Sequence, residues 1–270
     1  RVGGMKNLLT SFIFIMSLLV VSSCAQREDS VFPEYQIEEF RFKGKDAKIV
    51  LPKAESNGQW IWRARFWGHE PQTDKALLDH GFHLVYIDVS DLFGNQEAVE
   101  LWNSFYKHCK EKYDLSQKVV LEGMSRGGLI IYNWAAQNTE KVACIYADAP
   151  VCDIKSWPGG LYNGLGSKKD WETCLKAHQL DTQSVLEYED IPLFTSARVA
   201  KAQIPVLHVY GTADEVVPHK ENTLLLAKTF EENGGKIILI PKEGVGHHPH
   251  SLEDPKQIVD FILENTINEK

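Results

Sequence analysis

The chain has 270 residues, 43% of them hydrophobic and 24% charged, which is the composition of an ordinary globular protein of one or two domains. Its formal net charge of −8 argues against binding to nucleic acid and against adhesion to an anionic membrane surface, since both need basic surfaces. Nineteen glycines and eleven prolines are too few for a collagen-like or low-complexity chain.

The first 23 residues predict an export signal that is removed from the mature protein. Lys6 precedes an apolar run over residues 8–21, which is short for a membrane span and typical of a signal peptide. Residues 21–24, Val-Ser-Ser-Cys, resemble the lipobox of bacterial lipoproteins. This resemblance implies a lipid on Cys24, a tether over residues 24–34 and residence in the cell envelope, with the lipid as the only membrane contact. The alternative is an ordinary secretory signal with an incidental cysteine. Residues 1–4 precede the start methionine and look like an upstream extension of the reading frame.

Four cysteines remain after the predicted cleavage: Cys109, Cys144, Cys152 and Cys174. An oxidising envelope permits a disulfide, and Cys152 with Cys174 is the favoured pair because both lie in one irregular segment. Four free thiols in a packed domain are equally compatible with the sequence.

Strand-like and helix-like segments alternate over residues 35–270. Strands are predicted over residues 37–42, 47–51, 60–66, 83–89, 118–121, 142–147, 205–210 and 236–240. Helices are predicted over residues 73–80, 96–113, 127–137, 219–233 and 255–265. This alternation predicts an α/β domain with a mostly parallel sheet and helices on both faces. Residues 152–203 break the alternation and predict a small cap at the carboxyl edge of the sheet, where such folds bind ligands.

A nucleophile motif is predicted where the strand over residues 118–121 runs into the helix over residues 127–137. Residues 123–128 read Gly-Met-Ser-Arg-Gly-Gly, a G-x-S-x-G pattern. A sharp turn between strand and helix exposes Ser125, and the glycines let the two elements pack closely. The amide of Arg126 then faces the negative charge that develops on a substrate oxygen. A glycine-rich turn with a capping serine is the structural alternative.

A serine nucleophile needs a base to take its proton and an acid to orient that base. Asp214 follows the strand over residues 205–210, and His247 comes directly after Gly246, beyond the strand over residues 236–240. The order Ser125, Asp214, His247 is the one expected for a strand-to-helix nucleophile of this kind.

With these three motifs the chain resembles the α/β-hydrolase family over nearly all of residues 35–268. The resemblance implies an α/β-hydrolase fold, a Ser125–His247–Asp214 triad and no cofactor. His248 stays open as an alternative base. Asp148 and Asp153 stay open as alternative acids, because some members of the family carry the acid one strand earlier.

Three clustered histidines, His247, His248 and His250, raise the question of a metal site. They lack the i, i+4 helical spacing of a zinc-binding helix, so no metal is predicted.

The second oxyanion donor is expected from Phe66 or Trp67, in the loop after the strand over residues 60–66. The Ser-Arg-x-Gly arrangement around Arg126 is similar to that of glucuronoyl esterases, although Met124 stands where that family has cysteine. The similarity implies cleavage of a sugar-acid ester, with Arg126 adding charge to the oxyanion site or pairing with an anionic substrate group. A salt bridge inside the turn is the alternative. Trp67 and Trp157 are expected to contact the substrate.

The sequence thus predicts an exported serine esterase that acts on a plant or host polysaccharide. One alternative is a serine peptidase that resembles the prolyl oligopeptidase group, although residues 25–59 leave no room for that group's usual propeller domain. The other is a glycan-binding surface lipoprotein that has lost catalysis.

Overall fold

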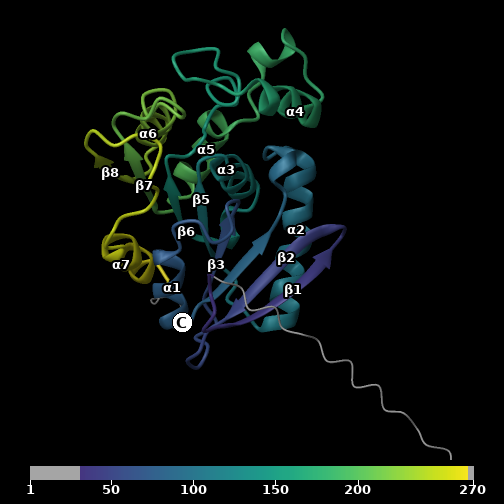
Figure 1. Ribbon diagram of the computed structural model, residues 1–270, viewed down its shortest axis with the longest axis vertical. Helices are drawn as coiled ribbons and strands as arrows, with labels where there is room; N and C mark the ends of the chain where they lie inside the picture. Colours follow the sequence, from purple (N-terminus) through teal and green to yellow (C-terminus); the bar gives the residue numbers. More distant parts are fainter. Residues whose placement is uncertain (1–30, 267–270) are drawn as a thin grey trace, which may run out of the picture.

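Eight strands form one sheet in the computed structural model, which describes residues 31–266 (Figure 1). The strand order is β1-β2-β4-β3-β5-β6-β7-β8. The strands are β1 (Gln36–Phe42), β2 (Lys45–Leu51), β3 (Trp60–Ala64), β4 (His83–Ile87), β5 (Val119–Met124), β6 (Val142–Asp148), β7 (Val206–Gly211) and β8 (Ile237–Lys242). Strands β3 to β8 run parallel, and β1 and β2 pair antiparallel at one edge. The predicted mostly parallel sheet is confirmed.

Helices cover both faces of the sheet. Helices α1 (Gln72–Asp79) and α7 (Lys256–Glu264) pack on one face, and α2 (Gln96–Tyr113), α3 (Gly127–Gln137), α5 (Pro192–Lys201) and α6 (Thr223–Glu232) pack on the other. Neighbouring strand residues therefore enter different cores: Trp62 stacks on Trp102 of α2 at 3.9 Å, whereas Ile61 joins the core beneath α1 and α7. Burial of both faces explains the nearly continuous apolar strands.

The predicted cap over residues 152–203 divides into two parts. Helix α5 packs against α3 and α6 and belongs to the layer that covers the sheet. The preceding residues carry α4 (Lys168–His178) and the short helix η3 (Ser184–Glu187), and α4 lies above α2 and α3 in Figure 1. A separate cluster that includes Phe93, Trp157 and Cys174 joins this segment to the domain.

Several predicted elements are shorter in the structure, and two of them differ for a clear local reason. The strand predicted over residues 60–66 ends at Ala64, because Arg65 and Phe66 have positive φ angles of 69° and 49°. The helix predicted over residues 219–233 begins at Thr223. The side chain of Asn222 instead accepts a hydrogen bond from the Cys152 amide (2.8 Å) and donates one to the Pro218 carbonyl (3.1 Å), and so ties the turn before α6 to the cap.

The favoured disulfide between Cys152 and Cys174 is wrong. Both thiols are free and buried, as are those of Cys109 and Cys144. Cys152 lies in the core beneath α3, where its thiol donates to the Pro150 carbonyl, whereas Cys174 lies in the separate cluster of the cap. Burial raises the pKa of the Cys174 thiol to about 12, so this side chain is a neutral packing group.

The predicted signal peptide over residues 1–23 and the lipidation site Cys24 lie outside the described residues. At the start of the described part, Phe32 is fully buried and packs on Tyr35 and Trp67. This end of the predicted tether therefore packs on the domain. None of the helices within residues 31–266 has the length and apolar character needed to cross a bilayer.

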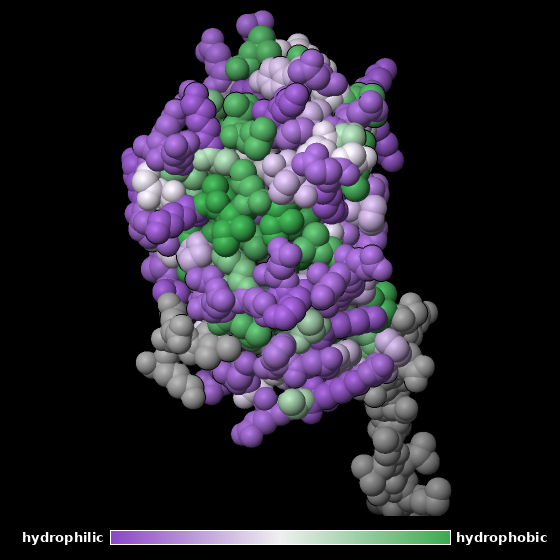
Figure 2. All heavy atoms as spheres, turned by 90° about the vertical axis from the view of Figure 1, so that its left-hand side faces the viewer, coloured by the Kyte–Doolittle hydropathy of each residue, from purple (hydrophilic) through white to green (hydrophobic). Residues whose placement is uncertain are grey.

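An apolar hollow of about 790 Å³ opens at the β8 edge of the sheet, between β8, α6 and α7. The green patch in the middle of Figure 2 lies on this side of the molecule. Its apolar lining includes Leu224, Ile238 and Phe261. Ser125, Asp214 and His247 are not among the residues that line it.

Candidate active site

Ser125 lies on the sharp turn between β5 and α3 with a φ angle of 49°, a left-handed conformation that is costly for any residue other than glycine. Glycines make this turn possible. A Cβ on Gly123 would lie 2.6 Å from Ile131, one on Gly127 would lie 2.5 Å from the Ala64 carbonyl oxygen, and one on Gly128 would lie 2.7 Å from Pro150. The G-x-S-x-G-G pattern is therefore required by close packing between strand, helix and neighbouring loops.

Ser125, His247 and Asp214 form one chain of hydrogen bonds. His247 Nε2 lies 2.9 Å from Ser125 Oγ, and His247 Nδ1 lies 2.7 Å from Asp214 Oδ2. A carboxylate only accepts hydrogen bonds, so Nδ1 carries the proton and the Nε2 lone pair faces the serine hydroxyl. The Asp214 carboxylate is held from its other side, because Oδ1 accepts from the amides of Val216 and Val217 at 2.9 Å each. The structure thus brings together all three residues predicted for the triad.

The alternative acids have other partners. Asp148 accepts from His250 Nδ1 (2.7 Å) and from the Ser251 amide (2.7 Å). Asp153 accepts from Tyr162 Oη and from the Lys155 amide inside the cap. Only Asp214 among these carboxylates is hydrogen-bonded to the histidine that faces Ser125.

The alternative base, His248, is exposed and packs edge-on against His247, with ring centroids 5.0 Å apart. Burial lowers the pKa of the His248 imidazole, and the neighbouring rings of His250 and His247 lower it further. The hydrogen bond to Ser125 Oγ comes from His247, so the geometry favours His247 as the base.

Arg126 is clamped against the cap. Its guanidinium contacts the rings of both Phe93 and Trp157, at 4.7 and 4.9 Å from their centroids, and donates to Asp170 Oδ1 of α4 at 2.9 Å. Burial lowers the pKa of the Arg126 guanidinium, and Asp170 opposes that shift. The predicted salt bridge inside the turn is thus a bridge from the turn to the cap. Trp157 contacts the side chain of Arg126, the residue next to Ser125, and its contact with a substrate stays a prediction.

The expected oxyanion donors lie on two loops. Arg126 is the N-cap of α3, so its amide is at the open end of that helix, whereas the Ser125 amide donates to the Asp148 carbonyl at 2.9 Å. The loop that carries Phe66 is held by the Phe66 carbonyl, which accepts from Arg63 Nε (3.2 Å) and from the His69 amide (3.1 Å). The Trp67 indole packs on Phe32 and on Tyr86, a position that gives no support to a substrate contact.

A buried ion network beneath the site has no signal in the sequence. Arg63 of β3 is 1% exposed and pairs with Asp74 of α1 and with Glu122 of β5 (3.1 Å for the second pair). Its guanidinium also donates to the His69 carbonyl. Burial raises the pKa of the Glu122 carboxyl well above its usual range. The network holds β3, β5 and the loop after β3 in one arrangement below Ser125.

Sequence reasoning also missed Asp170, Phe93 and His69, because each approaches the site from a distant segment. The Ser167–Asp170 spacing does predict the start of a helix, and Ser167 is indeed the N-cap of α4. Nothing in that spacing indicates that Asp170 reaches Arg126.

A sequence profile of the prolyl oligopeptidase family matches residues 88–268, more than half of the chain. Comparison with curated protein sequences gives no match.

Solved structures with a similar fold include both peptidases and an esterase. The acylaminoacyl peptidase of Pyrococcus horikoshii is 14% identical with a TM-score of 0.59, over 79% of this chain and 37% of that one. A putative dipeptidyl aminopeptidase IV from Bacteroides ovatus is 12% identical with a TM-score of 0.66, over 86% and 36%. Est1E from Butyrivibrio proteoclasticus is 18% identical with a TM-score of 0.57, over 86% and 99%. The chain thus spans little more than a third of the length of the two peptidases. The predicted α/β-hydrolase fold is confirmed.

Proposed function

This chain belongs to the prolyl oligopeptidase family and is a serine hydrolase, and from this premise we propose that it cleaves carboxylic esters of a polysaccharide. The observation that carries the proposal is the hydrogen-bond chain from Ser125 through His247 to Asp214. It supplies an activated nucleophile without a metal or cofactor taking part in the proposed steps.

In the acylation step, Ser125 Oγ attacks the ester carbonyl carbon while His247 Nε2 takes the hydroxyl proton. Asp214 stays ionised and stabilises the imidazolium that forms, through the bond from Nδ1. The tetrahedral oxyanion is stabilised by the amide of Arg126 and by that of Phe66 or Trp67. Return of the proton to the leaving alcohol oxygen gives the acyl-enzyme.

In the deacylation step, water takes the place of the alcohol. His247 Nε2 removes a proton from that water, which attacks the acyl carbon, and the tetrahedral intermediate then collapses with return of the proton to Ser125 Oγ. The products are a carboxylic acid and the free serine.

Arg126 supports a substrate with a carboxylate or a sugar ring. Its side chain is 15% exposed, belongs to the residue after the nucleophile, and contacts both Phe93 and Trp157. Guanidinium groups bind carboxylates in a bidentate manner, and aromatic rings suit the faces of sugars. The carboxylate of a sugar acid would bind the Arg126 guanidinium, which also donates to Asp170. The proposal therefore requires that Arg126 binds both carboxylates, or that the substrate takes the place of Asp170.

A peptidase activity is the second candidate, and the family match favours it because the matched family is named for a peptidase. It uses the same triad and differs only in the bond that is cleaved. Because peptidases and Est1E share this fold, the fold does not distinguish a peptidase from an esterase, and a substrate test must decide between them.

The first experiment measures hydrolysis of p-nitrophenyl acetate by the purified chain, with and without a serine-directed fluorophosphonate. Ser125→Ala is the control, and mass spectrometry locates the adduct. Turnover with an adduct on Ser125 supports the mechanism. Acetylated, methyl-esterified and feruloylated glycans are then compared with proline-containing peptides, and faster turnover of the peptides would replace the esterase proposal by the peptidase. If the protein is folded but shows neither turnover nor an adduct, both enzyme proposals fail, and the catalytically inactive glycan-binding lipoprotein is the alternative that remains.

We further propose that the protein is exported and anchored in the cell envelope by a lipid on Cys24. The support is the sequence over residues 1–24 alone. Fractionation of cells that express the Cys24→Ala variant tests the anchor. Persistent membrane association of this variant would contradict it.

A further inference from the structure

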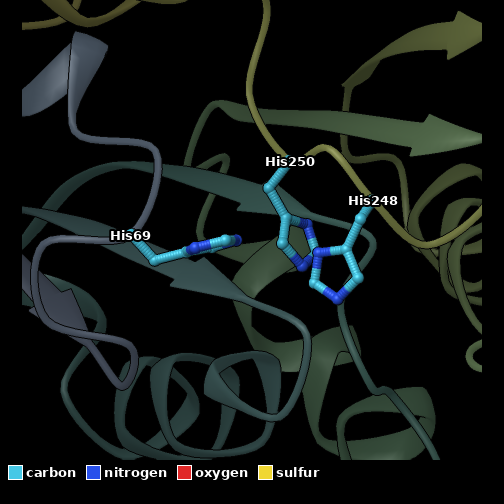
Figure 3. Close-up of side chains that lie close together, drawn as sticks. All are labelled: His69, His248 and His250. Carbon is cyan, nitrogen blue, oxygen red and sulfur yellow. The ribbon is translucent and has the colours of Figure 1, made fainter.

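Three histidines outside the triad converge beside it. His69 comes from the loop after β3, and His248 and His250 come from the loop after β8, on the opposite side of the cluster (Figure 3). One nitrogen from each ring lies within 4.8 Å of the other two. Ring centroids are 4.9 to 5.7 Å apart, and the ring planes cross at 81° to 89°. In T-shaped pairs of this kind the edge of one ring points toward the face of the next.

The hydrogen bond of His250 leaves the other nitrogen of its ring free for a metal. Its Nδ1 donates to Asp148 Oδ1 at 2.7 Å, because a carboxylate can only accept. In the neutral ring, Nε2 then carries the lone pair. A carboxylate behind a histidine is the usual outer support of a metal ligand, since it fixes the tautomer and orients the ring. The same carboxylate accepts from the Ser251 amide, which holds the loop.

His69 presents a buried nitrogen that lacks a hydrogen bond. Its Nε2 is shielded from solvent and has no hydrogen-bond partner within residues 31–266. The backbone of His69 is anchored, because its carbonyl accepts from the buried Arg63 guanidinium and its amide donates to Phe66. A buried polar atom without a partner is costly, and a metal ion would give it one.

His247 does not belong to this group, because both of its nitrogens are used by Ser125 and Asp214. The trio considered from the sequence, His247, His248 and His250, therefore differs from the trio that the fold assembles. The spacing argument against a metal site applied to helices, whereas these ligands come from two loops 179 residues apart, the difference between positions 69 and 248.

We propose that His69, His248 and His250 bind one divalent transition-metal ion such as Zn²⁺. Three imidazoles are a known zinc-ligand set and leave a fourth position for water. Nitrogens at 2.0–2.1 Å from one tetrahedral zinc lie about 3.4 Å apart, so nitrogens that now lie within 4.8 Å of one another must approach by up to about 1.4 Å through rotation of their side chains. His248 is exposed, so an ion reaches the site from solvent.

The ion would join two loops that flank the nucleophile. The loop after β3 carries the expected oxyanion donors Phe66 and Trp67, and the loop after β8 carries His247. A shared metal therefore links the oxyanion side of the site to the general base. A ligand that binds only the folded state raises the melting temperature, so zinc is expected to do so.

The test is titration of the purified, chelator-treated chain with ZnSO4 by calorimetry, together with the shift in melting temperature. The wild type is expected to bind one ion per chain. His69→Gln and His248→Gln are each expected to weaken binding about 100-fold or more, since loss of an outer support alone costs about 10–100-fold. Two controls should bind as the wild type does: His80→Gln, at an exposed histidine elsewhere, and His247→Gln, which removes the base but none of the three ligands.

Several outcomes would overturn the proposal. The first is a wild type that binds no zinc, and the second is unchanged affinity in both His69→Gln and His248→Gln. If His247→Gln loses zinc binding and His69→Gln retains it, the proposed ligand set is wrong. The ligands would then be the three histidines that are clustered in the sequence, with His247 in place of His69. Because His248 is exposed, His248→Gln decides the question if the His69 variant does not fold.

Discussion

Asp214→Asn tests the candidate active site sharply, because the surrounding hydrogen bonds fix how an amide at this position must face. Oδ1 of Asp214 accepts from the amides of Val216 and Val217, so the carbonyl oxygen of asparagine takes that position. The NH2 group then replaces Oδ2 and faces His247 Nδ1. An amide NH2 group only donates hydrogen bonds and cannot accept one from Nδ1–H, so His247 changes to the tautomer with the proton on Nε2. That tautomer cannot take the proton of Ser125.

The expected loss is about 10⁴-fold in kcat, which is the cost of the same change in a known serine-protease triad. At 1.36 kcal/mol for each factor of ten, this is about 5.4 kcal/mol of transition-state stabilisation. Both backbone hydrogen bonds are retained but become neutral, so the free energy of unfolding falls by only about 1–2 kcal/mol.

The assay is steady-state hydrolysis of p-nitrophenyl acetate at pH 7.5, with the melting temperature measured in parallel. Asp148→Asn is the matched control, since it makes the same change in the neighbouring pair with His250. It should keep kcat within about tenfold, because Asp148 is not bonded to His247. A loss of less than tenfold in Asp214→Asn, or a larger loss in Asp148→Asn, would refute the assignment of the acid.

Two further predictions concern the fold that supports the site. Gly127→Ala places a Cβ 2.5 Å from the Ala64 carbonyl oxygen, so the free energy of unfolding, measured by urea denaturation, should fall by about 1–3 kcal/mol. Gly246→Ala is the control. Its Cβ would have its nearest neighbouring atom at 4.0 Å, so the same free energy should change by less than about 0.5 kcal/mol. Equal effects would contradict the packing argument. Burial lowers the pKa of His208 to about 3, so unfolding takes up a proton below the ordinary value of 6.5, and stability falls as the pH drops through this window. The loss from this group should reach about 2 kcal/mol at pH 5 and be absent in His208→Gln, and an unchanged pH slope in that variant would exclude His208 as its source.

The local patterns of the chain determined the elements and the order of the candidate triad. Both faces of the sheet are buried, so apolar strands were distinguishable from amphipathic helices, and most predicted boundaries agree with the structure to within two residues. The nucleophile turn was predictable because close packing at Gly123, Gly127 and Gly128 leaves a pattern in consecutive residues. The acid and base were predictable because each follows a strand at the same edge of the sheet.

Contacts between distant segments were decided only by the tertiary structure. The choice of Asp214 over Asp148 rests on which histidine each carboxylate meets, and both lie at the ends of strands with the same local character. The free thiol of Cys152 and the packing of Trp67 follow from which core each side chain enters. The approach of His69 to His248 and His250, in the loop after β8, needs the carboxyl ends of β3 and β8 to lie at the same edge of the sheet. Local sequence encodes backbone conformation and burial, whereas the identity of a side chain's partners depends on how the whole sheet is assembled.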